Sequence, residues 1–341
     1  MKIGKVDLAK QVYIIAEVGG NHNGDPETVY RLVEEAAKAG ADAVKFQTYK
    51  AETLVHPDQE PLPIVRKHYK TQLERFRSLE LPWEVYERII GRCRELGIDF
   101  LTTPFDLEIC HRFAPLMPAI KIASGDLTYH QLIRAAAATG KPVILSTGMA
   151  NVEEIAAAAA LVPAEQLALL HCVSVYPLPD EQANLRAITA MRRLWPAIPI
   201  GYSDHTLGPE ACLAAVALGA RIVEKHFTLD RNQRPGDHVL SLEPAQMQEM
   251  VGQIRRIDAM LGVEEKRPAP GETSMSQWMR RGVYAARALP AGHCIVATDL
   301  AIVRPAAALS PAAAERLVGR LVARPIPAGG VIEDSLFMAS E

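Results

Sequence analysis

Four glycines divide the chain in the same way, because each follows a segment with helical periodicity and precedes a short, β-branched apolar segment. They are Gly40, Gly97, Gly140 and Gly219. A glycine is common just past the end of a helix, since it adopts the left-handed conformation there without a steric penalty. Helix, glycine and buried strand in this order are typical of βα units, in which helices alternate with parallel strands.

Extended along the chain, this pattern predicts eight strands that alternate with eight helices. The predicted strands are 11–18, 41–48, 98–103, 118–123, 142–146, 166–172, 197–203 and 221–227. The predicted helices are 26–39, 82–96, 106–114, 129–139, 151–161, 184–194, 208–218 and 244–261. Such alternation over about 250 residues is the expected size of a closed parallel barrel. We therefore predict an α/β fold whose main part is a (β/α)8 TIM barrel.

The second predicted strand supports a closed barrel. Its alternation places Lys45 and Gln47 on one face and Val44 and Phe46 on the other. In a barrel the outward residues pack on helices, and the inward residues near the carboxyl ends of the strands line a polar site. We therefore expect Lys45 and Gln47 to face the interior.

The chain changes character after Leu261. Residues 262–280 are rich in proline and charged residues, which predicts an exposed linker. Residues 281–341 contain short apolar segments separated by Pro-Ala-Gly turns, which predicts a small β-rich domain. We expect residues 1–261 to form the catalytic barrel, with 50–81 as a long functional loop above it.

The composition argues against several classes of partner. Lys and Arg number 37 against 40 Asp and Glu, and the resulting net charge of −3 indicates no nucleic-acid or membrane partner. The amino-terminal residues contain no apolar run like that of a signal peptide. The 5 cysteines lack CxxC spacing and fit reduced thiols. These features predict a cytoplasmic protein.

Two histidines end the last two predicted strands. His205 and His226 are joined by one predicted helix, so their strands should be adjacent and parallel. With Asp204 and Glu224 close by, they suggest a divalent metal ion with open coordination positions. The alternative is that the two histidines form separate hydrogen bonds to loops.

Polar residues occur at or near the ends of all eight predicted strands. They are Glu17, Lys45, Gln47, Thr103, Lys121, Ser124, Asp126, Ser146, His171, Ser174, Ser203, His205, Glu224 and His226. Two lysines, Lys45 and Lys121, aimed at one interior space repel each other, and an anionic ligand relieves that repulsion. The pattern therefore predicts an anionic substrate, such as a phosphate ester with a carboxylate, beside a metal.

Six motifs resemble those of the sialic acid synthase family, in the family's order. They are IIAEVGGNHNG at 14–24, ADAVKFQT at 41–48, KIASGD at 121–126, LSTGM at 145–149, GYSDHT at 201–206 and VEKHFT at 223–228. The C-terminal segment is similar to the family's antifreeze-like (SAF) domain. The family includes synthases of legionaminic and pseudaminic acids and spore-coat homologues.

The resemblance implies a reaction and the residues that perform it. It implies condensation of phosphoenolpyruvate with the open-chain aldehyde of N-acetylmannosamine or a related N-acylated hexosamine, which gives a nine-carbon 2-keto-3-deoxy acid and phosphate. By motif position, the catalytic residues would be Glu17, Lys45, Lys121 and Asp126, and the substrate-binding residues would be Gln47, Thr103, Ser124, Ser146, Ser174, Tyr176, Ser203, Asp237 and Arg304. His205 and His226 would hold Mn²⁺, with Mg²⁺ or Co²⁺ as alternatives.

The resemblance also implies a domain-swapped homodimer, in which the SAF domain of one subunit covers the barrel of the other. Arg304 matches the family's arginine that reaches the sugar's acyl group. Three features depart from the family. Ala306-Ala-Ala308 replaces a Gly-x-Gly stretch, Asp126 replaces a frequent Glu, and Ser174 replaces a frequent Asn. These departures bear on the loop conformation and on which sugar is accepted.

Two other functions compete with this interpretation. A related phosphoenolpyruvate-dependent synthase could act on another aldose, including a phosphorylated one, and the sequence does not separate the two. A non-catalytic carbohydrate-binding protein is suggested by the C-terminal domain alone, and it leaves the lysines and histidines of the barrel unexplained. Among single residues, we expect Met149 to belong to the core and Cys172 to be a buried thiol.

Overall fold

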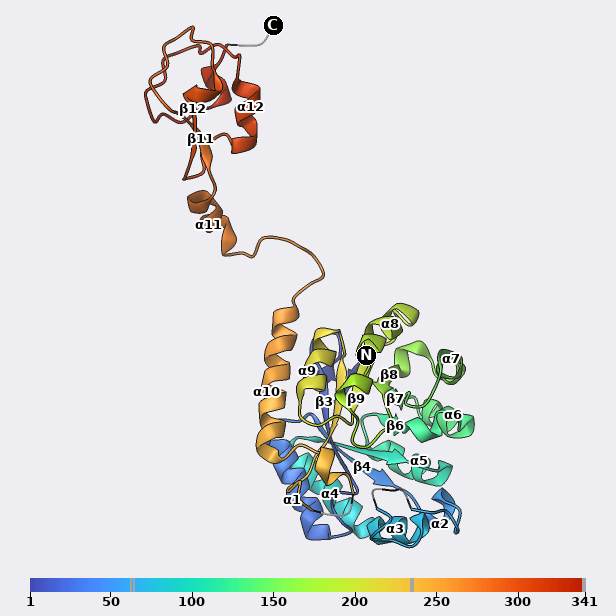
Figure 1. Ribbon diagram of the computed structural model, residues 1–341. Helices are drawn as coiled ribbons and strands as arrows, with labels where there is room; N and C mark the ends of the chain where they lie inside the picture. The colour runs from blue at the N-terminus through green and yellow to red at the C-terminus, as the bar shows by residue number, and fades with distance from the viewer. Residues whose placement is uncertain (62, 64, 234–235, 339–341) are drawn as a thin grey trace. The chain divides into compact units, whose positions relative to one another are not determined.

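The computed structural model describes residues 1–61, 63, 65–233 and 236–338. Eight parallel strands form its central sheet, and they confirm the eight strands predicted from the sequence (Figure 1). They are β3 (Tyr13–Gly19), β4 (Ala43–Thr48), β5 (Asp99–Pro104), β6 (Ile120–Ile122), β7 (Val143–Ser146), β8 (Leu167–Cys172), β9 (Ile200–Asp204) and β10 (Ile222–His226).

The strands curl into a nearly closed barrel. Their order is β5-β4-β3-β10-β9-β8-β7-β6, so the last strand along the chain pairs with the first barrel strand. Within the residues that the structure describes, β5 and β6 at the two ends of this order share no hydrogen-bonded ladder. The carboxyl ends of all eight strands point the same way, because every pair is parallel.

Eight helices follow the barrel strands, as the sequence predicted. They are α1 (Pro26–Lys38), α4 (Trp83–Leu96), α5 (Leu107–Phe113), α6 (His130–Ala138), α7 (Val152–Ala159), α8 (Arg186–Leu194), α9 (Glu210–Ala217) and α10 (Pro244–Leu261). In Figure 1 they surround the strands. Sequence reasoning missed α2 (Ala51–Leu54) and α3 (Gln72–Leu79), which lie in the segment expected to be a loop, and the hairpin β1 (Lys2–Ile3) and β2 (Val6–Asp7).

Local chemistry explains how α1 starts and packs. The side chain of Asp25 accepts a hydrogen bond from Thr28 N at 2.9 Å, and Pro26 occupies the first turn, where its missing N–H costs nothing. Leu32 and Val33 on its apolar stripe are fully buried. Burial of such side chains stabilises the fold by about 1.5–3 kcal/mol each.

The wall of the barrel separates an apolar outer layer from a polar interior. Val44 and Phe46 of β4 are fully buried in the hydrophobic layer between strands and helices. Lys45 lies between them in sequence and forms its contacts on the opposite face, with polar side chains. The alternation predicted for this strand is therefore confirmed. It places an ammonium group inside the barrel near the carboxyl ends of the strands.

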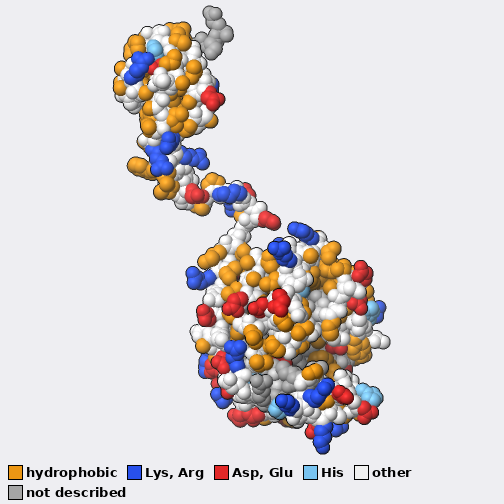
Figure 2. All heavy atoms as spheres, in the orientation of Figure 1, with side chains coloured by type: hydrophobic (Ala, Val, Ile, Leu, Met, Phe, Trp, Pro, Cys, Tyr) orange, Lys and Arg blue, Asp and Glu red, His pale blue; other side chains and the backbone are white. Residues whose placement is uncertain are grey.

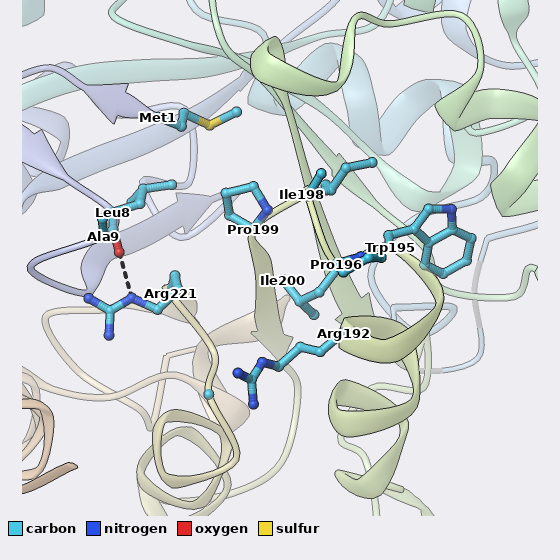
Figure 3. A pocket seen from close by; sticks show the side chains of 12 residues that line it. Met1, Leu8, Ala9, Arg192, Trp195, Pro196, Ile198, Pro199, Ile200 and Arg221 are labelled. Carbon is cyan, nitrogen blue, oxygen red and sulfur yellow. Dashed lines mark hydrogen bonds between the residues drawn. The ribbon is translucent and has the colours of Figure 1, made fainter. Parts of the chain in front are cut away.

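A hollow of about 490 Å³ lies at the other end of the barrel, beside the starts of β9 and β10 (Figure 3). Trp195, Pro199 and Arg221 are among its lining residues. Arg221 donates a hydrogen bond to Leu8 O at 2.6 Å, drawn in Figure 3. None of the site residues predicted from the sequence lines this hollow, so it is separate from the predicted chemistry.

Residues Met1–Gly262 form one compact unit, and residues Val263–Glu341 form a second. The stretch predicted to be an irregular linker contains helix α11 (Glu272–Met279), which the sequence did not predict. Its side chains Met275 and Trp278 are exposed, and hydrophobic side chains lie at the surface there in Figure 2.

The rest of this unit is built on β11 (Gly282–Ala285) and β12 (Leu300–Val303), which pair antiparallel, and it includes the short helix α12 (Ala314–Leu317). Its small core includes Ile295 and Ile332. The Ala306–Ala308 stretch needs no glycine, because the described residues other than glycine with positive φ are Asn23, Met149 and Asn184.

Among the described residues, no helix is both long enough and apolar enough to cross a lipid bilayer.

Candidate active site

Lys45 is the centre of a buried charged cluster inside the barrel. Its Nζ lies 2.5 Å from Glu17 Oε2 on β3 and 3.7 Å from Glu224 Oε2 on β10. It also donates a hydrogen bond to Thr103 Oγ1 on β5 at 3.2 Å. Gln47 Nε2 donates to the other Glu17 oxygen at 2.9 Å. Four neighbouring strands thus bring these predicted site residues together.

Lys121 lies on the other side of Glu224. Its Nζ donates to Ser146 Oγ at 2.7 Å and to Ile122 O at 3.0 Å, and it lies 4.0 Å from Glu224 Oε1. Ser203 Oγ donates to the same Glu224 oxygen at 3.0 Å. Glu224 is therefore the counter-charge of both lysines. Sequence reasoning placed Glu224 among the polar residues at the strand ends and close to the metal ligands, but it did not identify this carboxylate as the counter-charge of the lysines.

The two carboxylates of this cluster differ in their affinity for protons. Burial raises the pKa of Glu17, Lys45 opposes that effect, and Glu224 adds to it. Burial would also raise the pKa of Glu224, but the positive charges of Lys121 and Lys45 outweigh it and lower the pKa. Glu17 is therefore the carboxylate that accepts a proton more readily, which suits proton transfer.

The two predicted metal ligands face each other at the ends of β9 and β10. The ring centroids of His205 and His226 lie 5.4 Å apart. His205 Nδ1 lies 2.8 Å from Val173 O and donates to it, so Nε2 keeps its lone pair. His226 Nδ1 is buried and has no hydrogen-bond partner in the part of the chain that the structure describes, and Asp237 Oδ2 lies 4.0 Å from it.

This donor set fits a divalent cation held by two imidazoles. An unpaired, buried ring nitrogen costs free energy unless a ligand satisfies it, and two neutral imidazoles with open positions are a common transition-metal arrangement. Among the described residues, no group of three or more His, Cys, Asp or Glu is arranged to hold a metal ion. Water or substrate would have to supply the remaining ligands.

Asp204 does not belong to this site, so the expectation that it lies near the metal is wrong. Its two oxygens accept hydrogen bonds from Tyr202, Thr206 and Lys225 on the outer face of the barrel wall. The reason is strand alternation, because Ser203 and His205 face inward and the residue between them must face outward.

Ser124 and Ser174 both lie against Gly148, in the loop after β7. Ser124 Oγ accepts a hydrogen bond from Gly148 N at 3.0 Å. A Cβ atom at position 148 would lie 2.8 Å from Ser124 Oγ and closer still to Ser174 Oγ. The glycine is therefore needed for both hydroxyls to approach the backbone at this position, next to the end of the strand that carries Ser146.

Asp126 follows Ser124 in a short 3-10 turn. Its Oδ2 is buried and has no hydrogen-bond partner among the described residues. Burial raises the pKa of this carboxyl to about 6, against the opposing charge of Lys121. A carboxyl that titrates near neutral pH is able to donate or accept a proton during a reaction.

Two further residues differ from the sequence expectations, and a third agrees with them. His171 faces away from the site, where its ring stacks on Tyr202 at 5.7 Å and its Nε2 lies 2.9 Å from Ala183 O. Met149 is 73% exposed with φ of 66°, so it does not belong to the core. Cys172 is a buried thiol as expected, and its Sγ lies 3.9 Å from His205 Nδ1.

Tyr176 lies over the histidines, with its ring centroid 4.0 Å from that of His205. Arg304 is exposed and belongs to the second compact unit. The structure gathers the predicted site residues of the barrel near the carboxyl ends of its strands.

Two family models match the chain. Residues 32–266 match the NeuB family, and residues 280–338 match the SAF domain. The chain is 42% identical over 311 residues to an uncharacterized protein of Methanocaldococcus jannaschii, with 89% of each chain covered. It is 36% identical to the N,N'-diacetyllegionaminic acid synthase of Campylobacter jejuni, with 92% of this chain and 97% of that protein covered.

A solved structure shares the fold. The N-acetylneuraminic acid (sialic acid) synthetase of Leptospira borgpetersenii superimposes with a TM-score of 0.73 at 34% identity. The match covers 81% of this chain and 94% of that one.

Proposed function

Because the chain belongs to the NeuB family, we propose that it is a phosphoenolpyruvate-dependent synthase of a nonulosonic acid. It would condense phosphoenolpyruvate with the open-chain aldehyde of an N-acylated hexosamine, N-acetylmannosamine or a related sugar. The products would be a nine-carbon 2-keto-3-deoxy acid and phosphate. The activity named for the Campylobacter relative supports this reaction class.

The observation that carries the proposal is the pair of buried ammonium groups among hydroxyls. Lys45 and Lys121 lie on either side of Glu224, within 4.0 Å of it, with Thr103 and Ser146 bonded to them. Charge-assisted hydrogen bonds from two ammonium groups suit the phosphate and carboxylate of phosphoenolpyruvate. The hydroxyls of Ser124, Ser174 and Ser203 would complete this subsite.

His205 and His226 would hold the divalent cation, which we propose is Mn²⁺, with Mg²⁺ or Co²⁺ as alternatives. When bound, the cation would supply Lewis-acid polarisation of the aldehyde oxygen of the sugar. The aromatic ring of Tyr176 against His205, and the carboxylate of Asp237 near His226, would limit how the sugar enters.

The remaining chemistry falls to side chains that move protons. Carbon 3 of phosphoenolpyruvate forms a bond to the aldehyde carbon, and the aldehyde oxygen gains a proton to become a hydroxyl. Water adds to carbon 2 and loses one proton, which leaves a hydroxyl there. The bond from carbon 2 to the phosphate oxygen then breaks as this hydroxyl loses its proton, and the products are the ketone and a phosphate that has taken up that proton. Glu17, positioned by Gln47, and Asp126 are the carboxyls that would donate and accept these protons.

We further propose a homodimer in which the SAF domain of one subunit lies over the barrel of its partner. The exposed guanidinium of Arg304 is then free to contact the acyl group of the sugar. A dimeric mass by light scattering is the expected result, and a monomeric mass would remove this part of the proposal.

The experiment that tests the proposed activity measures phosphate release from phosphoenolpyruvate. The acceptors would be N-acetylmannosamine, its 6-phosphate, 2,4-diacetamido-2,4,6-trideoxyhexoses and plain aldoses, each with Mn²⁺ and with chelator. We expect metal-dependent release with one N-acylated sugar. Release only with a plain or phosphorylated aldose would instead support the related synthase, and no release with any acceptor would reopen the assignment.

A further inference from the structure

Asp204 and Lys225 immediately precede the two histidines, and their side chains meet behind the site, on the outer face of the barrel wall. Lys225 Nζ lies 2.7 Å from Asp204 Oδ2, and both side chains have 0% exposure. The two residues are also direct partners in the register of β9 with β10. The strands that carry His205 and His226 are therefore linked one residue before each histidine.

The pair also holds the residue that follows His205. Asp204 accepts hydrogen bonds from Lys225 Nζ at 2.7 Å, Tyr202 Oη at 2.9 Å, Thr206 N at 2.9 Å, Thr206 Oγ1 at 3.1 Å and Cys212 Sγ at 3.5 Å. Lys225 Nζ in turn donates to Thr206 O at 2.6 Å. The residues on both sides of His205 are thus fixed by one hydrogen-bonded network.

Stability alone does not explain such a pair. Removing two charges from water costs several kcal/mol for each ion, and apolar residues of similar volume are often at least as stabilising. Backbone hydrogen bonds already join β9 to β10 along this stretch. What the ion pair adds is a fixed geometry. Its hydrogen bonds hold the turn after β9 in place and set the distance between the ends of the two strands.

We propose that the Asp204–Lys225 pair is a positioning device that holds His205 and His226 at the separation and orientation required to share one divalent cation. The inference rests on the metal site of the proposed function. Replacing residues that do not bind the metal but orient its ligands commonly lowers metal affinity by about 10–100-fold.

The test compares two changes at opposite ends of β10. The variant Asp204→Asn/Lys225→Met removes both charges and keeps side chains of similar size, and the Asn oxygen can still accept from Thr206 N. The single variant Lys225→Met serves if the double variant folds poorly, because Asp204 still accepts hydrogen bonds from Tyr202 and Thr206. The control is Arg221→Met, which breaks the ion pair between Arg221 and Asp258 (2.6 Å) far from the histidines.

Two quantities are measured for each protein: Mn²⁺ affinity by titration calorimetry, and the thermal unfolding midpoint in chelator. We expect about 10–100-fold weaker Mn²⁺ binding in the charge-free variant, with an unfolding midpoint close to that of the native protein. We expect Arg221→Met to lower the unfolding midpoint and leave Mn²⁺ affinity unchanged.

Native Mn²⁺ affinity in the charge-free variant would overturn the inference. The inference would also be overturned if Arg221→Met lost as much Mn²⁺ affinity as the charge-free variant at an equal loss of stability. The Asp204–Lys225 pair would then affect Mn²⁺ binding only through the overall stability of the fold. If the native protein binds no Mn²⁺, the proposed metal site fails and the inference fails with it. If the native protein binds Mn²⁺ and the variants bind it equally well, the inference alone fails.

Discussion

Replacement of Glu224 by Gln tests whether this carboxylate is the counter-charge of both active-site lysines. Its oxygens lie 3.7 Å from Lys45 Nζ and 4.0 Å from Lys121 Nζ. At a separation near 4 Å and an effective dielectric constant of 20, each such attraction is worth about 4 kcal/mol before desolvation is subtracted. The amide keeps an oxygen that accepts from Ser203, removes the negative charge and replaces the oxygen nearest Lys45 with a donor group.

We expect Glu224→Gln to lower the free energy of unfolding by about 3–5 kcal/mol, because among the described residues of the cluster it leaves Glu17 as the one carboxylate beside two buried ammonium groups. Urea unfolding in the absence of ligand measures this loss. The matched control is Glu52→Gln, which breaks an ion pair with Arg77 (2.7 Å) in which both side chains are more than half exposed. That change should cost less than about 1 kcal/mol.

Phosphoenolpyruvate provides a second measurement on the same variant. Under the proposed function its negative charge reaches the same two lysines, so it should raise the unfolding temperature more in Glu224→Gln than in the native protein. The reasoning would be refuted if Glu224→Gln cost no more stability than the surface control, or if phosphoenolpyruvate stabilised both proteins equally.

Three further predictions concern protonation and the metal. Asp126→Asn should leave stability unchanged at pH 4 and raise it by about 1–3 kcal/mol at pH 8 in urea unfolding, because the buried carboxyl favours its neutral form and destabilises the fold once pH rises through about 6. Asp299 is buried beside Arg287 and His293, and hydrogen bonds from Val296 N and the His293 ring lower its pKa to about 2. Asp299→Asn should therefore destabilise the SAF unit by about 2–3 kcal/mol at pH 7. In calorimetric unfolding, this difference in stability should disappear as pH falls from about 4 toward 2. His205→Ala should abolish Mn²⁺ binding in calorimetry while the fold, followed by circular dichroism, persists, because it removes one of the two imidazoles that the described part of the chain offers the cation.

Each of these three predictions has a contradicting result. Equal pH dependence of stability in Asp126→Asn and the native protein would show that this carboxyl is not held neutral by burial. If Asp299→Asn lowered the stability of the SAF unit by the same amount at every pH, the effect would come from packing and not from the charge of Asp299. Undiminished Mn²⁺ binding in His205→Ala would place the cation elsewhere.

The barrel could be predicted from the sequence because its signals are local. A glycine such as Gly97, with φ of 71°, marks a helix end, and the alternation around Lys45 identifies both a strand and its inner face. Helix α3 was missed because Gln72–Leu79 is a short segment with mostly polar residues, and it lies within a stretch that reads as a long loop. Helix α11 was missed because the prolines and charged residues that precede it led us to predict an exposed linker there.

Site residues could be predicted from the sequence only where the residue at which each strand ends was predicted correctly. Asp204 was misplaced because β9 extends one residue beyond the predicted end at 203, so alternation continues and turns its side chain outward. The role of Glu224 depends on the distances from its oxygens to two lysines on other strands, and no spacing in the sequence encodes these. Exposed Met149 shows the same limit, since a left-handed conformation at a non-glycine residue has no local signal.

The most direct test of the proposed condensation is the fate of labelled phosphoenolpyruvate. The protein would be incubated with Mn²⁺, the acceptor panel and phosphoenolpyruvate carrying ¹³C at carbon 3, and the products would be identified by mass spectrometry and NMR. The account predicts a nine-carbon 2-keto acid with the label in its carbon-3 methylene group and one phosphate released for each acid formed. Labelled pyruvate and phosphate, with the sugars unchanged, would contradict it and would indicate hydrolysis without carbon–carbon bond formation.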